Sequence, residues 1–197
     1  KYNFAESGIP DLKLDDLLKK CGQDVRVLTD TFLGNNDTRG SQLLRESVAR
    51  TYKEVLPEDI IITNGTSEAL YIFLNIKMTK NSKVLLMTPA FPPLYLIPES
   101  LGAEVIPFNI LNYKPKEVLV RSLCEAIQKY SPNLLIFNSP HNPTGITFST
   151  EQIKTIISFA KENNVEVLFD EHYRYLPIKE EKIIESKKES TNQDEKN

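Results

Sequence analysis

Short β-branched runs alternate with longer segments of helical periodicity from Asp59 onward. The runs that read as strands are 60–63, 83–88, 103–108, 134–138 and 165–170. This alternation is typical of a parallel sheet whose strands are joined by crossover helices. We therefore predict an α/β fold with a mostly parallel sheet and helices on both of its faces.

Three segments have the apolar spacing of helices. One carries Leu119, Leu123, Ala126, Ile127 and Tyr130 on a single face, and a second carries Ile153, Ile156, Ile157 and Ala160. A stripe at this spacing lets a helix cover a sheet. The second helix opens with Ser149 and Gln152, three residues apart, which predicts a capping box. The third is predicted to begin near Ser41, on the spacing of Leu44, Val48, Tyr52 and Val55.

At 197 residues, the chain can bury one good core. We expect an N-terminal arm and loop over residues 1–40, with an extended start, followed by a partial large α/β domain over residues 41–177. Residues 178–197 are dominated by Lys, Glu, Ser, Asn and Gln. Such a segment buries too little apolar surface to offset chain entropy, so we expect a charged, disordered tail.

Composition argues against several classes of protein. The net charge is -3 and the basic residues are interspersed, so we expect no nucleic-acid partner. No apolar stretch approaches a membrane span, and the start lacks the apolar core of a signal peptide, so we expect no membrane partner. Cys21 and Cys124 lie far apart in apolar-periodic segments, which favours buried thiols and a cytoplasmic location.

The unusual residues all follow the ends of predicted strands. They occupy 64–68, 89–91, 139–145 and position 170. In an open α/β sheet, ligands bind beyond the carboxyl ends of the strands. We therefore predict that one edge of the sheet carries the functional site.

Two of these segments have both a functional and a structural interpretation. Gly65, Thr66 and Ser67 begin a helix whose free N–H groups can hold a phosphate, although a plain N-cap uses the same residue types. Phe91 can stack on a flat ligand ring, although aromatic side chains also dominate protein cores. Local chemistry leaves both alternatives open.

The other two segments favour a functional interpretation. Residues 139–145 contain two prolines and a glycine, which fix an irregular loop that presents the amide of Asn142. The alternative is an elaborate turn with an Asx hydrogen bond. Asp170 follows the apolar run 165–169, where an unpaired charge is costly. We expect its carboxylate to have a cationic partner.

Three rival classes fit less well. Residues 165–171 are similar to the magnesium-binding strand of a P-loop ATPase, but no glycine-rich loop ending in Gly-Lys precedes them. None of the glycines has the G-x-G-x-x-G spacing of a Rossmann dehydrogenase. A metal site would draw on His141, His172, Asp170 and Glu171. Because neighbouring strand residues point to opposite faces, Asp170 and Glu171 cannot easily share an ion, and we expect no metal site.

These segments together resemble the fold-type I pyridoxal-phosphate (PLP) aminotransferases, the class that includes aspartate and aromatic aminotransferases. Ser-Pro-His-Asn-Pro-Thr-Gly at 139–145 is similar to the strongest signature of that family. Asp-Glu-His-Tyr-Arg at 170–174 follows it after one helix and one strand, as the family pattern requires. The segments 36–45, 65–70 and 89–91 also stand in family order.

The resemblance implies a site for pyridoxal 5′-phosphate made of Gly65, Thr66, Ser67, Phe91, Asn142, Asp170 and Tyr173. The first three would bind the phosphate. Phe91 would stack on the pyridine ring, while Asn142 and Tyr173 would donate hydrogen bonds to the ring hydroxyl oxygen. Asp170 would pair with the protonated ring nitrogen and keep the ring able to absorb electrons.

The chain departs from the family in one respect that concerns catalysis. In the family, a lysine well beyond the Asp/Tyr motif forms a Schiff base with the cofactor, and we expect the chain to end before that point. Four lysines of the tail come too soon after Asp170 and lie in a charge run; they are Lys179, Lys182, Lys187 and Lys188. Asn35 stands where many members have a tyrosine that reaches the phosphate of the partner subunit.

We therefore expect the complete protein to transfer an amino group between an amino acid and a 2-oxo acid. The resemblance suggests a homodimer. The chain is interpreted, in order of preference, as a fragment of such an enzyme, as one part of a split enzyme, or as a degenerate protein. The non-enzyme alternative is a catalytically inactive PLP-fold protein that binds a partner or regulates, and it predicts cofactor affinity without turnover.

Overall fold

The computed structural model describes Gly8 and residues 11–176. Contacts within the chain divide it into two units, Lys1–Ile62 and Thr63–Asn197. The predicted charged tail lies outside the described residues, and so does the predicted extended start apart from Gly8. Within the described part of the chain, no helix is both long and apolar enough to cross a membrane.

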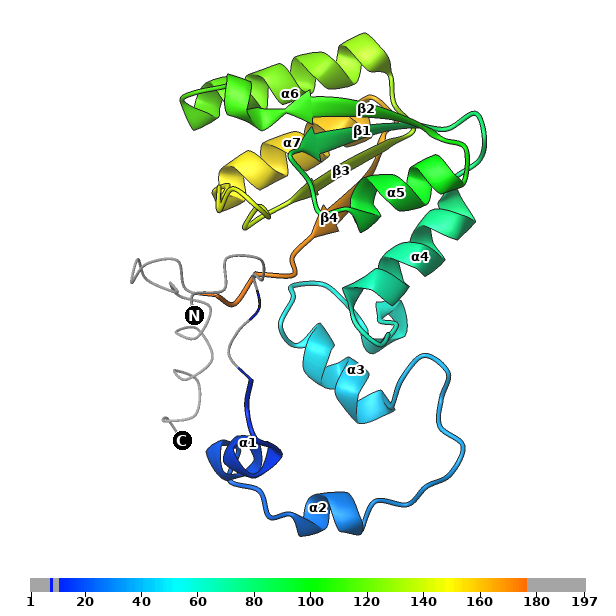
Figure 1. Ribbon diagram of the computed structural model, residues 1–197, viewed down its shortest axis with the longest axis vertical. Coiled ribbons are helices and arrows are strands. Elements are labelled where there is room, and N and C mark those ends of the chain that lie inside the picture. Colours follow the sequence, from blue (N-terminus) through cyan, green and yellow to red (C-terminus); the bar gives the residue numbers. More distant parts are fainter. Residues whose placement is uncertain (1–7, 9–10, 177–197) are drawn as a thin grey trace, which may run out of the picture. The chain divides into compact units, whose positions relative to one another are not determined.

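A parallel four-stranded sheet forms the centre of the second unit (Figure 1). Its strands are β1 (Lys83–Thr88), β2 (Glu104–Asn109), β3 (Leu134–Asn138) and β4 (Glu166–Asp170). Their spatial order is β2-β1-β3-β4, and every neighbouring pair is parallel. The parallel sheet predicted from the alternating pattern is therefore confirmed.

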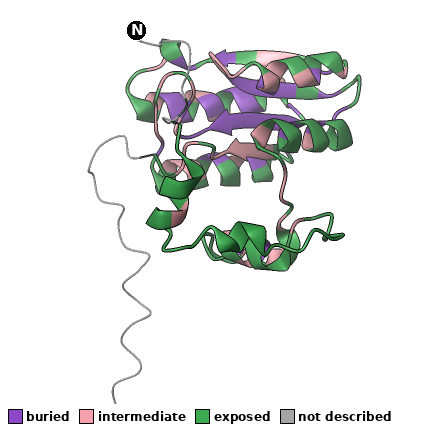
Figure 2. Cartoon of the chain, turned by 60° about the horizontal axis from the view of Figure 1, so that its bottom comes forward, coloured by how far each residue is buried: buried purple, intermediate pink, exposed green. Residues whose placement is uncertain are grey.

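Helices cover both faces of this sheet. The face with α4 (Thr66–Lys77) and α5 (Pro93–Ser100) and the face with α6 (Lys116–Tyr130) and α7 (Thr150–Glu162) each enclose a core. Val84 packs in the first core and Leu85 in the second, because successive strand residues point to opposite faces. Strands buried on both sides are apolar throughout, and Figure 2 shows β1 and β3 as largely buried. The prediction of helices on both faces is confirmed.

The two helices that pack together on one face largely follow the predicted apolar stripes. In α6, the predicted positions 119, 123, 126 and 127 are buried, and Tyr130 packs against the same core. In α7, Ile156 and Ala160 are buried, but Ile157 is mostly outside the core because it lies about 100° around the helix from Ile156. The capping box is confirmed.

One predicted strand is wrong. Residues 60–63 form no strand in the structure, and Ile61 is 63% exposed. The backbone N–H of Ile62 donates to the carbonyl oxygen of Arg39 at 2.9 Å, which is a single bond and not a ladder. A β-branched run becomes a strand only when a neighbour pairs along its length.

The first unit contains short helices: α1 (Leu14–Lys20), α2 (Arg26–Thr29), α3 (Gln42–Ala49) and the 3₁₀ turn η1 (Pro57–Asp59). A second 3₁₀ turn, η2 (Ile110–Asn112), belongs to the second unit.

The two cysteines differ from the expectation of buried thiols. Cys21 is exposed, so the expectation is wrong there, and Cys124 is half-buried.

Helix α3 begins after Ser41, as predicted, with the Ser41 hydroxyl accepting a hydrogen bond from the N–H of Leu44 at 3.4 Å. It ends at Ala49, so the predicted positions 52 and 55 lie beyond it. Its buried residues are Arg45 and Ala49, whereas Leu44 is 46% exposed. The predicted apolar face is therefore wrong, because the helix buries the guanidinium of Arg45 in place of Leu44.

Candidate functional site

Hydrogen bonds join three of the segments predicted to form the site. The backbone N–H of Ser139, which follows β3, donates to the carbonyl oxygen of Asp170 at 3.2 Å. The hydroxyl oxygen of Thr66, in the first turn of α4, lies 3.0 Å from Nδ1 of His172. The start of α4, the loop after β3 and the turn after β4 therefore meet at the carboxyl edge of the sheet.

Helix α4 begins at this edge with Gly65 as its N-cap. Gly65 has a φ of 87°, which side chains rarely adopt, and an added Cβ would meet no atom within 4 Å. The carboxylate of Glu68 accepts a hydrogen bond from the N–H of Asn64 and holds the preceding loop. The open helix start, with the hydroxyls of Thr66 and Ser67, has the chemistry of an anion site.

The loop after β3 is irregular, as predicted, and is fixed by its own hydrogen bonds. The buried Ser139 hydroxyl accepts from the N–H of Phe148 at 3.0 Å. The N–H of His141 donates to the carbonyl of Ile146 at 2.8 Å, and the N–H of Gly145 donates to the carbonyl of His141 at 2.7 Å. Asn142 is half-buried within this fixed loop.

His141 is held in this loop as a neutral side chain. It is only 2% exposed; its Nδ1 lies 2.8 Å from the hydroxyl of Thr144, and its Nε2 has no hydrogen-bond partner among the described residues. Burial lowers the pKa of His141 from 6.5 to about 4, because an imidazolium would lose its hydration there. The loop therefore excludes a charge at this position near neutral pH.

The turn after β4 brings a carboxylate, an imidazole and a phenol close together. Asp170 is half-buried, and its Oδ1 accepts a hydrogen bond from the N–H of His172 at 2.9 Å. The rings of His172 and Tyr173 meet edge to face with centroids 4.6 Å apart. Arg174 pairs with Glu171 at 3.5 Å. The sequence marks His172 only as a metal-ligand candidate, because nothing local to it indicates the contact with Thr66, 106 positions away.

Phe91 follows β1 and is half-buried against the core beneath α4 and α5. This position serves packing, and the partial exposure leaves part of the ring available to a ligand. The structure thus accommodates both interpretations of this residue.

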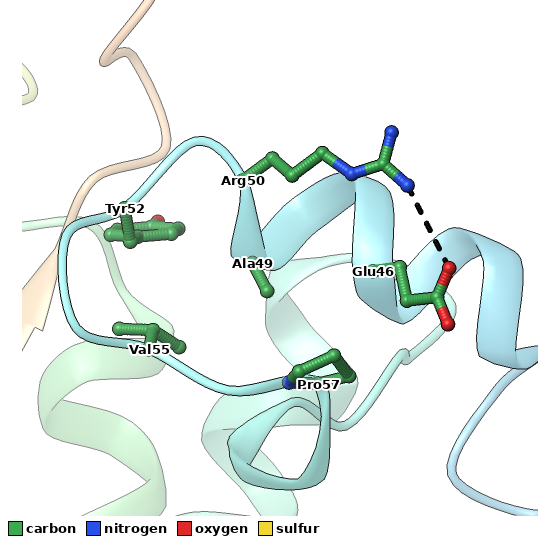
Figure 3. Close-up of a pocket in the computed structure, with 6 residues that line it drawn as sticks. All are labelled: Glu46, Ala49, Arg50, Tyr52, Val55 and Pro57. Carbon is green, nitrogen blue, oxygen red and sulfur yellow. Dashed lines mark ion pairs between the residues drawn. The ribbon is translucent and has the colours of Figure 1, made fainter.

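A separate hollow lies in the first unit, with a volume of about 410 Å³ (Figure 3). Its lining residues are Glu46, Ala49, Arg50, Tyr52, Val55 and Pro57. Arg50 and Glu46 pair across one turn of α3 at 3.7 Å. None of the predicted site residues lines this hollow.

Comparisons with known proteins give a consistent result. Residues 1–187 match the family described as "Aminotransferase class I and II". An aspartate aminotransferase of Sulfurisphaera tokodaii is 26% identical over 174 residues, covering 85% of this chain and 43% of the relative. A histidinol-phosphate aminotransferase of Caldanaerobacter subterraneus subsp. tengcongensis is 31% identical over 173 residues, covering 88% and 47%. The chain thus spans less than half the length of these curated relatives.

Solved structures share the fold. A PLP-dependent aminotransferase from Streptococcus suis has a TM-score of 0.69 and 28% identity, covering 81% of this chain and 44% of that one. A tetra mutant of the aspartate aminotransferase from Thermus thermophilus has a TM-score of 0.70 and 24% identity, covering 84% and 46%. The predicted fold class, a mostly parallel α/β sheet of the PLP-dependent transferase type, is confirmed.

Proposed function

Because the chain belongs to the family of class I and II aminotransferases, we propose that it binds pyridoxal 5′-phosphate and that the whole protein transfers an amino group between an amino acid and a 2-oxo acid. The contact between Thr66 and His172 carries this proposal. It joins a helix start whose chemistry suits an anion to the turn that holds a carboxylate. A cofactor with a phosphate at one end and a basic ring nitrogen at the other fits such an edge.

The phosphate of the cofactor suits the start of α4. In the proposal, Gly65, Thr66 and Ser67 bind it through backbone N–H groups and the two hydroxyls. The φ of 87° and the open space beside Gly65 support this role, because a side chain there would narrow the approach of an anion to the backbone. The positive end of the helix dipole adds to the attraction.

The ring of the cofactor suits the side chains that follow β1, β3 and β4. Asp170 would keep a proton on the pyridine nitrogen, and the N–H of His172 that binds Asp170 Oδ1 helps to orient this carboxylate. Phe91 would cover one face of the ring. Asn142 and Tyr173 would donate hydrogen bonds to the ring hydroxyl oxygen.

When bound, pyridoxal phosphate supplies an electron-accepting ring for chemistry at the Cα of an amino acid. The residues of this chain would anchor the phosphate, exclude water from one ring face and hold the proton on the ring nitrogen. The substrates would be small molecules, an amino acid and a 2-oxo acid. We further propose a homodimer in the cytoplasm, a setting that the two free cysteines favour.

Asp170→Asn tests this proposal, with pyridoxamine 5′-phosphate as the probe because it lacks an aldehyde that would react with lysines. The variant replaces a charged partner of the ring nitrogen with a neutral one. Its binding free energy for the probe is expected to weaken by about 1 to 3 kcal/mol, which is a loss of affinity of roughly 5- to 150-fold. Equilibrium dialysis with the fluorescence of the probe measures the change.

Glu166→Gln is the matched control, because it makes the same chemical change at the amino end of the same strand. Glu166 pairs with Lys77 at 2.5 Å, and both side chains are substantially exposed. Its substitution is expected to leave probe affinity within about twofold of the wild-type value. Equal affinities for wild-type and Asp170→Asn chains would refute the assignment of Asp170.

A further inference from the structure

His172 contacts groups at both ends of the proposed cofactor site. Its Nδ1 lies 3.0 Å from the hydroxyl oxygen of Thr66, a residue 106 positions away. Its backbone N–H donates to Oδ1 of Asp170 at 2.9 Å, and its ring packs edge to face on Tyr173. One residue thus ties the first turn of α4 to the turn after β4.

The hydroxyl of Thr66 has a single hydrogen, which it can donate either to His172 or to a phosphate oxygen. If Thr66 donates to Nδ1, its hydroxyl presents only lone pairs to a phosphate, and lone pairs repel an anion. If His172 instead carries a hydrogen on Nδ1 and donates it to Thr66 Oγ1, the hydroxyl hydrogen is available to the phosphate. A bound phosphate therefore favours the state in which Nδ1 of His172 is the donor.

We propose that His172 is a positioning residue that turns the hydroxyl of Thr66 toward the cofactor phosphate and makes it a donor. The inference rests on the proposed function, because it assumes that Thr66 binds that phosphate. A hydrogen bond received by a hydroxyl also strengthens the bond that the hydroxyl donates. Because His172 is exposed, water can exchange the ring hydrogens and the donor state is accessible.

The alternative is a purely structural tie between α4 and the turn after β4, and the two roles differ in what they affect. A structural tie supports the whole edge, so its loss would weaken every ligand of the site alike. A positioning role acts through the Thr66 hydroxyl, so its loss would weaken only ligands that carry a phosphate.

The test compares pyridoxamine 5′-phosphate with pyridoxamine, which has the same ring and no phosphate. In equilibrium dialysis of the full chain, His172→Ala is expected to weaken binding of the phosphorylated probe about five- to tenfold. Binding of pyridoxamine is expected to stay within about twofold and reports that the edge remains folded. His172→Asn, whose amide nitrogen can take the place of Nδ1, is expected to restore most of the affinity.

A double-mutant cycle with Thr66→Val identifies the group through which His172 acts. Since valine has no hydroxyl, His172→Ala is expected to cause no further loss in that background. The inference is overturned if both probes lose affinity equally, if neither does, or if the loss persists with Thr66→Val. If the wild-type chain binds neither probe, the proposed function is wrong, and this inference, which rests on it, is wrong as well.

Discussion

Replacing Arg45 with methionine is expected to lower the free energy of unfolding of the first unit by about 3 to 5 kcal/mol. The side chain of Arg45 is only 3% exposed. Its guanidinium donates to the carbonyl oxygens of Gly40 at 3.0 Å and Pro57 at 2.9 Å, to Asp37 at 3.1 Å and to Gln42 at 2.8 Å. Methionine fills a similar volume but leaves these acceptors without their donor.

Arg50→Met is the matched control, since it makes the same substitution on the same helix. The side chain of Arg50 is 74% exposed, and it pairs with Glu46 at 3.7 Å (Figure 3). Exposed ion pairs of this kind contribute little to stability, so the free energy of unfolding is expected to fall by less than about 0.5 kcal/mol. Native-state hydrogen exchange of the Gly40 and Ile62 amides measures the stability of this unit. Similar losses for both variants would show that the buried network does not stabilise it.

The strands show how far the sequence predicts this fold. The bounds of β1 and β3 are as predicted, because each is a central strand whose apolar run ends at polar or turn residues. The edge strands β2 and β4 begin one residue later than predicted. Each of them pairs with only one neighbouring strand, so that strand alone determines where the hydrogen-bonded pairing begins. The run 60–63 has similar composition but no pairing neighbour, and pairing over long separations is not a local property of the sequence.

The same limit applies to single side chains. Arg45 follows Leu44 in an apolar-periodic segment, and an arginine there is ordinarily placed in solvent. Its burial depends on the carbonyl of Pro57, which the path of the chain brings to within 2.9 Å. Likewise, the position of His172 two residues after Asp170 marks it as an edge residue, but its contact with Thr66 spans 106 positions. The predicted cofactor roles stay predictions, whereas the meeting of the segments is observed.

Acidification is expected to destabilise the second unit through His141. The pKa of His141 is lowered from 6.5 to about 4 by burial, so between these values the unfolded chain binds more protons than the folded chain. The free energy of unfolding therefore falls as the pH falls through this window, and stability is full only above the unfolded pKa. The loss attributable to His141 reaches about 3 kcal/mol near pH 4.

The chain has two histidines, which provides a matched comparison for this prediction. Urea unfolding would be followed from about pH 8 to about pH 4 for the wild-type chain, His141→Asn and His172→Asn. Asparagine does not titrate, so His141→Asn is expected to flatten the pH dependence by up to about 1.4 kcal/mol per pH unit. His172→Asn makes the same substitution outside the loop after β3 and controls for the change of side chain. If His141→Asn kept the wild-type pH dependence, the prediction would be contradicted. The imidazole of the wild-type chain would then be protonated in the folded state without disrupting the loop, and its buried Nε2 would find an acceptor once charged.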